Sequence, residues 1–302
     1  MIKYIIGIDG GGTKTLGVLF DLDGKPLHRV KEGFSNFSVD EAIAIENISL
    51  TIEKLLSTVS VKPNEVYIQL GIAGATKMRD KGLDVLLENR FNQKVSLETD
   101  ALVGLYSVKR ENESVIMAIG GTGSAIMSRE EGEINTIGGY GHLLGDEGSA
   151  YHLVISAFKN LIAEAEAQKP FGDLSKALLE HIHGESEQDV IPFIYSKNKS
   201  DIASISRITG PLARRGDAVT TELYKREGQL LAKQIVQAKK NFIKSDDLII
   251  APRGAFVLEA PFVMDSMMDY LKTHIKSFNI DLAPQEPVVG AFNLAKAKQN
   301  KE

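Results

Sequence analysis

The sequence predicts an α/β protein built from two related domains. Strand-like apolar runs alternate with segments of helical spacing, a pattern typical of α/β folds. A strand, a glycine turn and a second strand occur at the start of the chain and again near residue 114. The length of 302 residues is also large for one hydrophobic core.

The first half opens with two strands around a glycine run. Residues 4–9 are apolar and β-rich, residues 10–12 are glycines, residues 13–20 resume as a strand, and the turn signal at 21–24 leads to a third strand. Helical spacing follows at 40–60 and 76–90, and apolar strands are expected at 66–72 and 94–98.

The pattern restarts in the second half. Residues 114–119 and 124–128 are strands on either side of a second glycine-rich turn. Segments 147–168, 173–183 and 201–244 have a mostly helical pattern, and a strand is expected at 247–251. Further helices are expected at 260–277 and 288–299. We therefore predict one domain over residues 1–112 and another over 113–287.

Composition excludes several classes of function. The chain has 35 Lys and Arg against 40 Asp and Glu, and without a basic run it lacks the charge that nucleic acid or an anionic membrane requires. With 0 Cys, disulfides, thiolate zinc sites, iron–sulfur clusters and cysteine nucleophiles are excluded. We see neither a signal-peptide pattern nor an apolar run of membrane-spanning length, and we expect a cytoplasmic protein.

The segment 9–15 is a candidate phosphate site. Gly11 and Gly12 let backbone N–H groups approach an anion, and Thr13 and Lys14 add a hydroxyl and a charge. A P-loop is excluded, because a strand follows where that motif needs a helix. From these residues alone, a plain hairpin with Asp9 capping the turn is an equally good interpretation. The second turn, at 120–124, favours two hairpins that hold a nucleotide from both sides.

Four motifs carry a family resemblance. They are Asp-Gly-Gly-Gly-Thr-Lys-Thr at 9–15, Thr-Asp-Ala at 99–101, Gly-Thr-Gly-Ser at 121–124 and the segment 138–151. Together they resemble the N-acetylglucosamine kinases of the actin, sugar-kinase and heat-shock-chaperone ATPase superfamily. The resemblance implies two RNase-H-like domains with an active-site cleft between them, and a final helix, 288–302, that returns to the first domain. It also implies transfer of phosphate from ATP to the 6-hydroxyl of N-acetylglucosamine.

The resemblance also implies roles for individual residues. Asp9 would hold Mg²⁺ through water, and Asp100 would contact the sugar and accept the proton of its attacking hydroxyl. From spacing alone, Asp100 is more simply an N-cap for a helix that starts at Ala101. The ATP phosphates would be met by residues of both hairpins, namely Gly11, Gly12, Thr13, Lys14, Thr122 and Gly123.

Further implied contacts belong to the sugar and the nucleoside. Those to the sugar are Asn36, Gly139, Tyr140 and Asp146. Tyr140 replaces an indole common at its position, and Asp146 is alternatively a cap for a helix over 147–159. Those to the adenosine are Ala213, Gly216 and Gly254, next to a Pro252-Arg253 pair that departs from the glycines usual in the family.

The expected partner is a small amino sugar, with a homodimer as a further option. Glucosamine and N-acetylmuramic acid are the alternative substrates, since they differ from N-acetylglucosamine only at the 2-amino or 3-position. A non-catalytic sensor of ATP and sugar with the same fold is the alternative from another functional class.

Overall fold

The computed structural model describes residues 1–37, 39–108, 114–283 and 285–300. The chain divides into two compact units, Met1–Glu111 with Ala283–Glu302, and Asn112–Leu282. The predicted boundary between residues 112 and 113 lies outside the described residues, as do the last two residues of the predicted helix 288–302.

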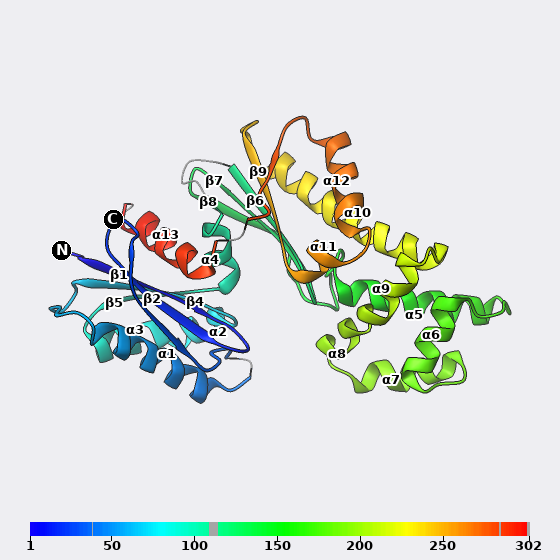
Figure 1. Ribbon diagram of the computed structural model, residues 1–302, viewed down its shortest axis with the longest axis horizontal. Coiled ribbons are helices and arrows are strands. Elements are labelled where there is room, and N and C mark those ends of the chain that lie inside the picture. Colours follow the sequence, from blue (N-terminus) through cyan, green and yellow to red (C-terminus); the bar gives the residue numbers. More distant parts are fainter. Residues whose placement is uncertain (38, 109–113, 284, 301–302) are drawn as a thin grey trace. The chain divides into compact units, whose positions relative to one another are not determined.

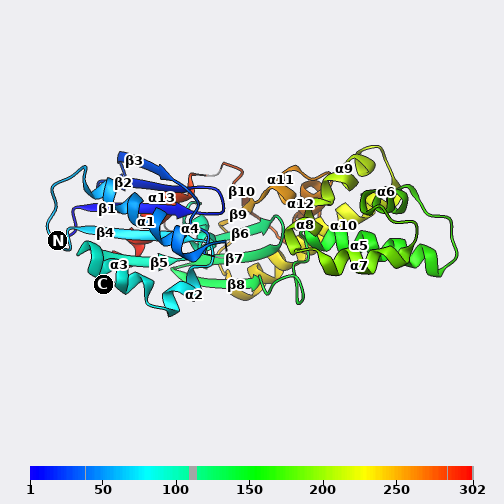
Figure 2. The same cartoon turned by 90° about the horizontal axis from the view of Figure 1, so that it is seen from below.

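The first unit contains a mixed five-stranded sheet in the order β3-β2-β1-β4-β5 (Figure 2). The antiparallel part consists of β1 (Tyr4–Gly10), β2 (Thr15–Phe20) and β3 (Pro26–Glu32). The strands β4 (Val66–Ile72) and β5 (Lys94–Glu98) continue the sheet in parallel with β1. The central strands are apolar almost throughout because both faces of the sheet are covered.

Helices cover the two faces of this sheet (Figure 1). One face carries α1 (Glu41–Leu56), α2 (Ala75–Asp80) and α3 (Leu83–Phe91). The other face carries α4 (Asp100–Tyr106) and α13 (Pro287–Gln299), so the last helix of the chain belongs to the first unit.

The side chains of β1 separate the two halves of this core. Ile6 and Ile8 pack with α1, α2 and α3, whereas Ile5 packs with Val288 and Phe292 of α13. Successive side chains of a strand point to opposite faces, so one apolar strand supports both layers.

The second unit repeats this topology with a sheet in the order β10-β9-β6-β7-β8. Here β6 (Ser114–Gly120) is antiparallel to β7 (Ser124–Glu130), which is antiparallel to β8 (Glu133–Gly138). The strands β9 (Leu248–Arg253) and β10 (Asn279–Ile280) are parallel to β6. The predicted α/β class and the repeated strand, glycine turn and strand are therefore confirmed.

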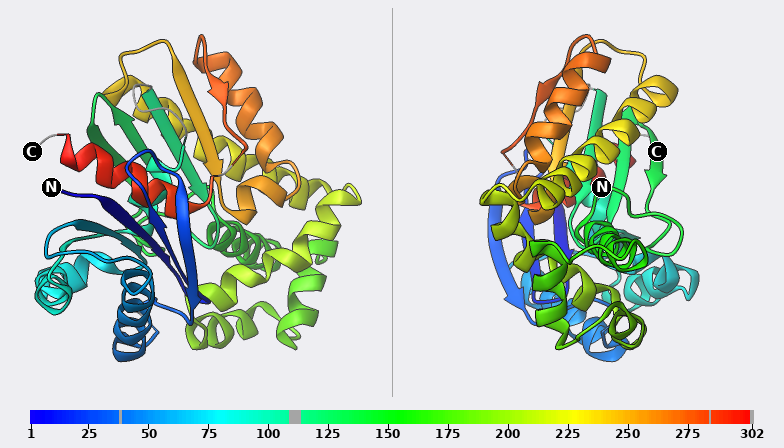
Figure 3. Two further views of the ribbon diagram at one scale, coloured as in Figure 1. Left: turned by 60° about the vertical axis from the view of Figure 1, so that its left-hand side comes forward. Right: turned by 90° about the vertical axis from the view of Figure 1, so that its right-hand side faces the viewer.

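The helices of the second unit fall into two groups (Figure 3). They are α5 (Ala150–Glu166), α6 (Asp173–Ile182), the 3-10 turn η1 (Glu187–Asp189), α7 (Val190–Ser196), α8 (Lys199–Ser204), α9 (Ser206–Arg214), α10 (Ala218–Phe242), α11 (Ala255–Glu259) and α12 (Val263–His274). The sheet shares one core with α10, α11 and α12, and a second core joins α5 to α6, α7, α8 and α9. None of the described helices is both long enough and apolar enough to span a membrane.

Two of the predicted helical segments contain more than one helix, and several short elements, among them η1, α7, α11 and β10, were not predicted. The segment 201–244 holds α8, α9 and α10, because the helix is interrupted at Ile205 and Gly216, at φ 89°, turns the chain before Asp217 caps α10. The segment 76–90 is two helices with Gly82 at φ 75° between them. The strand β8 was not predicted, since its short sequence, Glu-Ile-Asn-Thr-Ile-Gly, lacks a continuous apolar run.

Candidate active site

The loop 11–14 joins β1 to β2, whose ladder ends at the pair Gly10 and Thr15. Neither Gly11 nor Gly12 has a positive φ, and a Cβ on either would meet no atom within 4 Å. Backbone conformation and packing therefore do not explain these glycines, whereas an approaching ligand that needs bare backbone N–H groups does. Lys14 is exposed on the same loop.

A neighbouring loop is hydrogen-bonded to this hairpin. The Ser35 N–H donates to the Gly11 carbonyl at 3.0 Å, and the buried Thr15 hydroxyl donates to the Gly33 carbonyl at 2.7 Å. These bonds fix the chain on both sides of the turn. The structure thus brings Asn36, a residue implied for the sugar, next to residues implied for phosphate.

The parallel strands direct two carboxylates to one edge of the sheet. Asp9 lies beside Gly71 of β4 in the register, and Gly71 lies beside Glu98 of β5. Asp100 comes two residues after Glu98. Carboxyl ends of neighbouring parallel strands are where α/β folds place their ligand groups.

The pKa of Asp9 is raised above its ordinary value. Burial is the largest cause and the negative charge of Asp100 is the next, while the Lys14 ammonium lowers it. A divalent cation beside Asp9 would favour the ionised carboxylate and so oppose the effects of burial and of the Asp100 charge on its pKa. Mg²⁺ commonly keeps several waters and uses only one or two protein carboxylates, so Asp9 beside an open phosphate loop fits this ion. Among the described residues, no group of three or more Asp, Glu or His side chains forms a fuller cage.

Asp100 is the first residue of α4 and is exposed. The N-cap is Thr99, whose hydroxyl accepts the Leu102 N–H at 3.2 Å. The interpretation of Asp100 as the cap is therefore wrong. Its Oδ1 accepts the N–H of Ala101 at 2.9 Å, which leaves a carboxylate at the solvent-facing end of the helix.

The second hairpin, between β6 and β7, has the same open character. A Cβ on Gly121 would meet no atom within 4 Å, and Thr122 is exposed. The first N–H groups of α5, from Ala150 and Tyr151, donate to the carbonyls of Gly121 and Thr122 at 3.0 and 3.3 Å. The hairpin is thus attached to the start of α5.

Asp146 packs directly beneath this hairpin. Its side chain is 3% exposed, its Oδ1 accepts the Ser124 N–H at 3.0 Å, and its Oδ2 lies 2.6 Å from the Lys199 ammonium. The cap of α5 is Ser149, whose hydroxyl accepts from His152, so the alternative of Asp146 as a helix cap is wrong.

The other two residues implied for the sugar lie at the surface of the second unit. Gly139 is exposed with φ 74°, and the Tyr140 side chain is 73% exposed. Tyr140 lines a shallow groove with Leu144 and Lys233. An exposed aromatic ring of this kind is suited to stack on a sugar face.

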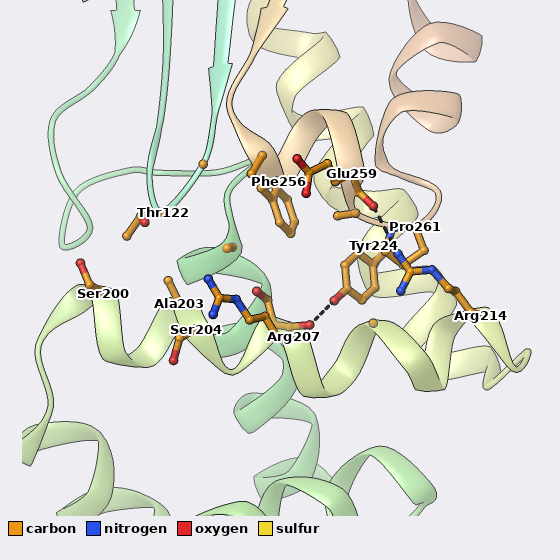
Figure 4. Close-up of a pocket in the computed structure, with 16 residues that line it drawn as sticks. Thr122, Ser200, Ala203, Ser204, Arg207, Arg214, Tyr224, Phe256, Glu259 and Pro261 are labelled. Atoms are coloured by element: carbon orange, nitrogen blue, oxygen red, sulfur yellow. Dashed lines mark hydrogen bonds between the residues drawn. The ribbon is translucent and has the colours of Figure 1, made fainter. Parts of the chain in front are cut away.

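A cavity of 540 Å³ opens beside the second hairpin (Figure 4). Its lining combines small, apolar and charged residues: Gly121, Thr122, Ala150, Ser200, Ala203, Ser204, Ser206, Arg207, Gly210, Arg214, Tyr224, Ala255, Phe256, Glu259, Ala260 and Pro261. This size, with aromatic walls and a few polar groups, suits a nucleoside. The Tyr224 hydroxyl donates to the Ser206 carbonyl at 2.7 Å, and burial raises the Tyr224 pKa to about 12.

The residues implied for adenosine lie near this cavity but are not among those that line it. Ala213 is fully buried in the core, while its neighbours Gly210 and Arg214 line the cavity. Gly254 has φ 100°, and a Cβ there would lie 2.6 Å from the Gly120 carbonyl, so this glycine allows β9 to approach the hairpin. Gly216 sits in the turn between α9 and α10.

Arg253, which departs from the family pattern, is turned toward β10. Its guanidinium donates to the Asp281 carbonyl at 2.7 Å and to the Asp281 carboxylate at 3.0 Å. It therefore ties the end of β9 to the segment after β10.

Sequence reasoning missed a buried carboxylate, Glu227 of α10. It is 0% exposed, its Oε2 accepts the Gly148 N–H at 2.8 Å, and its Oε1 is 2.8 Å from Nδ1 of His152. A sequence signal exists, because Glu227 falls three residues after Tyr224 and four before Leu231, on the apolar side of α10. Lys199 was missed as well, and nothing in its local sequence marks it.

Two sheets of the same topology, each with an open glycine hairpin between its first two strands, form the fold of the actin-like ATPases. A model of the BadF/BadG/BcrA/BcrD ATPase family matches residues 6–295, and the chain belongs to this family.

Relatives and solved structures agree with this assignment. The N-acetylmuramic acid/N-acetylglucosamine kinase of Clostridium acetobutylicum is 28% identical over 307 residues, 98% of this chain and 99% of that protein. The N-acetyl-D-glucosamine kinase of Dictyostelium discoideum is 31% identical over 236 residues, 72% of this chain and 73% of that protein. The predicted resemblance to this group is confirmed.

Two crystal structures show the same fold. One is a proposed N-acetylglucosamine kinase from Chromobacterium violaceum, with a TM-score of 0.70, 23% identity and coverage of 97% of this chain and 99% of that one. The other is the ROK hexokinase of Thermus thermophilus, with a TM-score of 0.66, 16% identity and coverage of 99% and 100%. The predicted actin-like ATPase fold is thereby confirmed.

Proposed function

We propose that this chain is an ATP-dependent amino-sugar kinase that phosphorylates the 6-hydroxyl of N-acetylglucosamine. The observation that carries the proposal is the position of Asp100. It stands exposed at the carboxyl edge of the first sheet, close enough to Asp9 for its charge to affect the Asp9 pKa, and it is not the cap of its helix. Relatives named as kinases of N-acetylglucosamine and N-acetylmuramic acid support the choice of substrate class.

The proposed chemistry is a single phosphoryl transfer. The sugar hydroxyl oxygen forms a bond to the γ-phosphorus of ATP, the bond from that phosphorus to its bridging oxygen breaks, and ADP leaves. Asp100 accepts the proton of the hydroxyl. Asp100 forms no covalent bond with the phosphoryl group, since positioning and charge neutralisation supply most of the rate enhancement in such reactions.

The hairpin residues supply the positioning. In the first unit, the open backbone at Gly11 and Gly12 and the Lys14 ammonium are suited to bind phosphate oxygens. In the second unit, the open backbone at Gly121 and the Thr122 hydroxyl are suited to the same task. Asp9 would hold Mg²⁺, and the bound ion would neutralise charge on the phosphates. The cavity beside Thr122 receives the nucleoside.

The test is ADP production over a panel of sugars. The panel holds N-acetylglucosamine, glucosamine, N-acetylmuramic acid, N-acetylmannosamine and glucose, each with ATP and Mg²⁺. The highest kcat/KM is expected for N-acetylglucosamine. A preference for N-acetylmuramic acid or glucosamine would change the substrate and keep the kinase, whereas no stimulation by any sugar would refute the proposal and favour a sensor.

Three further properties are proposed with this function. The protein acts in the cytoplasm, forms a homodimer, and has functional domains at 1–112 with 288–302 and at 113–287. Light scattering after size-exclusion chromatography tests the dimer, since a monomer of 33.0 kDa is readily distinguished from twice that mass.

A further inference from the structure

Lys199 connects three parts of the second unit. It is the first residue of α8, and the turn before it is fixed by Asn198, whose side chain accepts the Asp201 N–H at 2.9 Å. The Lys199 side chain is 31% exposed, and its ammonium lies 2.6 Å from Asp146 Oδ2. The ammonium thus faces a carboxylate that is itself almost entirely buried.

The ion pair lies directly under the second hairpin. A Cβ on Gly123 would collide with the Lys199 ammonium and would lie 2.7 Å from Asp146 Oδ1. Gly123 has no positive φ, so a side chain at this position would be opposed by contact with these two charged groups rather than by backbone strain. The hairpin therefore rests on the Lys199–Asp146 pair.

The same helix reaches the nucleotide cavity. Ser200, the residue after Lys199, lines that cavity together with Thr122 of the hairpin (Figure 4). One turn of chain thus presents an ammonium to Asp146 and a neighbouring hydroxyl to the cavity. A buried carboxylate without a cation is strongly unfavourable, so the orientation of Asp146 depends on Lys199.

We propose that Lys199 is a positioning residue of the kinase. Its ion pair fixes the orientation of the Asp146 carboxylate, and it fixes the hairpin that carries Thr122. The inference rests on the proposed function, because the sugar contact of Asp146 is the one implied by the resemblance to N-acetylglucosamine kinases. Lys199 is assigned no contact with the sugar or with ATP, and its effect passes through Asp146 and Gly123.

The test compares Lys199→Met, which removes the ammonium and keeps much of the apolar stem, with Lys199→Arg, which restores a cation. Lys197→Met is the matched control, because Lys197 lies two residues earlier, is exposed, and has its ammonium over the Phe193 ring at 5.5 Å. Steady-state kinetics are measured with the sugar and ATP varied separately, alongside melting temperatures of all variants.

For Lys199→Met we expect kcat/KM for the sugar to fall roughly 10- to 100-fold, the range found when a group that orients a functional ligand is removed. KM for the sugar should rise more than KM for ATP, Lys199→Arg should recover part of the loss, and Lys197→Met should match the wild type. In an Asp146→Asn background the Lys199→Met effect should shrink, because groups that act through one another are non-additive.

Several outcomes would overturn the inference. A lowered melting temperature with unchanged kcat and KM would make the pair structural only. A rise in KM for ATP alone would contradict an effect of Lys199 that passes through Asp146. Additive effects of the two substitutions in the double variant would contradict it as well. Failure of the wild type to phosphorylate any sugar refutes the proposed function instead, so the two failures are distinguishable.

Discussion

The substitution Asp100→Asn separates a kinase from a protein that only binds ATP and sugar. Asparagine keeps the shape of the side chain and an oxygen able to accept the Ala101 N–H, but it cannot accept the proton of a sugar hydroxyl. Because Thr99 is the cap of α4, the substitution leaves the capping hydrogen bond in place. Activity and stability should therefore respond very differently.

The two effects differ in size. Loss of a general base costs about 10²–10⁴-fold in rate, which corresponds to about 2.7–5.4 kcal/mol on the barrier at roughly 1.36 kcal/mol per decade. The stability effect is the loss of one exposed negative charge at a helix N-terminus, about 0.3–1 kcal/mol. The negative charge beside Asp9 also disappears, which moves the Asp9 pKa back toward its ordinary value and offsets part of this loss.

The assay measures kcat, the sugar dissociation constant and the melting temperature of one variant with one control. The control is Thr99→Ala, which removes the cap and should cost about 1 kcal/mol of stability while leaving kcat within a few-fold of the wild type. Asp100→Asn should show the reverse. Turnover by Asp100→Asn close to that of the wild type would refute Asp100 as the base.

Three further predictions concern stability. Asp9→Asn should abolish turnover yet raise the melting temperature at pH 7 without Mg²⁺. Because the pKa of Asp9 is raised in the folded state, the wild type loses stability as the pH rises from 3.8 to the folded-state pKa. The advantage of the variant should therefore shrink as the pH falls toward 3.8 in a pH series of thermal melts. Glu227→Ala leaves the buried Gly148 N–H without its acceptor and removes the partner of the partly exposed His152 ring. The free energy of unfolding in urea should fall by about 1–3 kcal/mol for the buried N–H. Glu227→Gln should lose less, and equal losses would contradict the hydrogen-bond account. Gly254→Ala places a Cβ 2.6 Å from the Gly120 carbonyl oxygen, whereas at Gly216 φ is also positive but a Cβ would meet no atom within 4 Å. Gly254→Ala should therefore lower the melting temperature more than Gly216→Ala. The opposite order in thermal melts would refute the close approach at Gly254.

Local sequence was sufficient for the strands and the two hairpins. The central strands β1, β4 and β6 are apolar almost throughout, as expected of strands that are buried on both faces, although β4 also buries Gln69. The glycines of both hairpins predicted the candidate phosphate sites from sequence, because a phosphate site of this kind uses backbone N–H groups of neighbouring residues. The family resemblance was likewise carried by short contiguous motifs.

Helix starts were less well determined. Thr99 and Asp100 are adjacent and both residue types are good caps, so sequence could not choose between them. The choice depends on where β5 ends in the sheet. Asp146 was ambiguous for the same reason, and it is the position of Ser149 relative to the hairpin that makes Ser149 the cap of α5.

Contacts between distant parts of the chain were decided only by the tertiary structure. The pairing of Lys199 with Asp146 and of Glu227 with Gly148 joins separate helices and loops. The cavity proposed for the nucleoside likewise combines the hairpin with α8, α9 and α11, and Arg214 rather than Ala213 lies on its wall. Periodicity shows that a helix has a buried face, but which partner covers that face depends on how all the elements pack together.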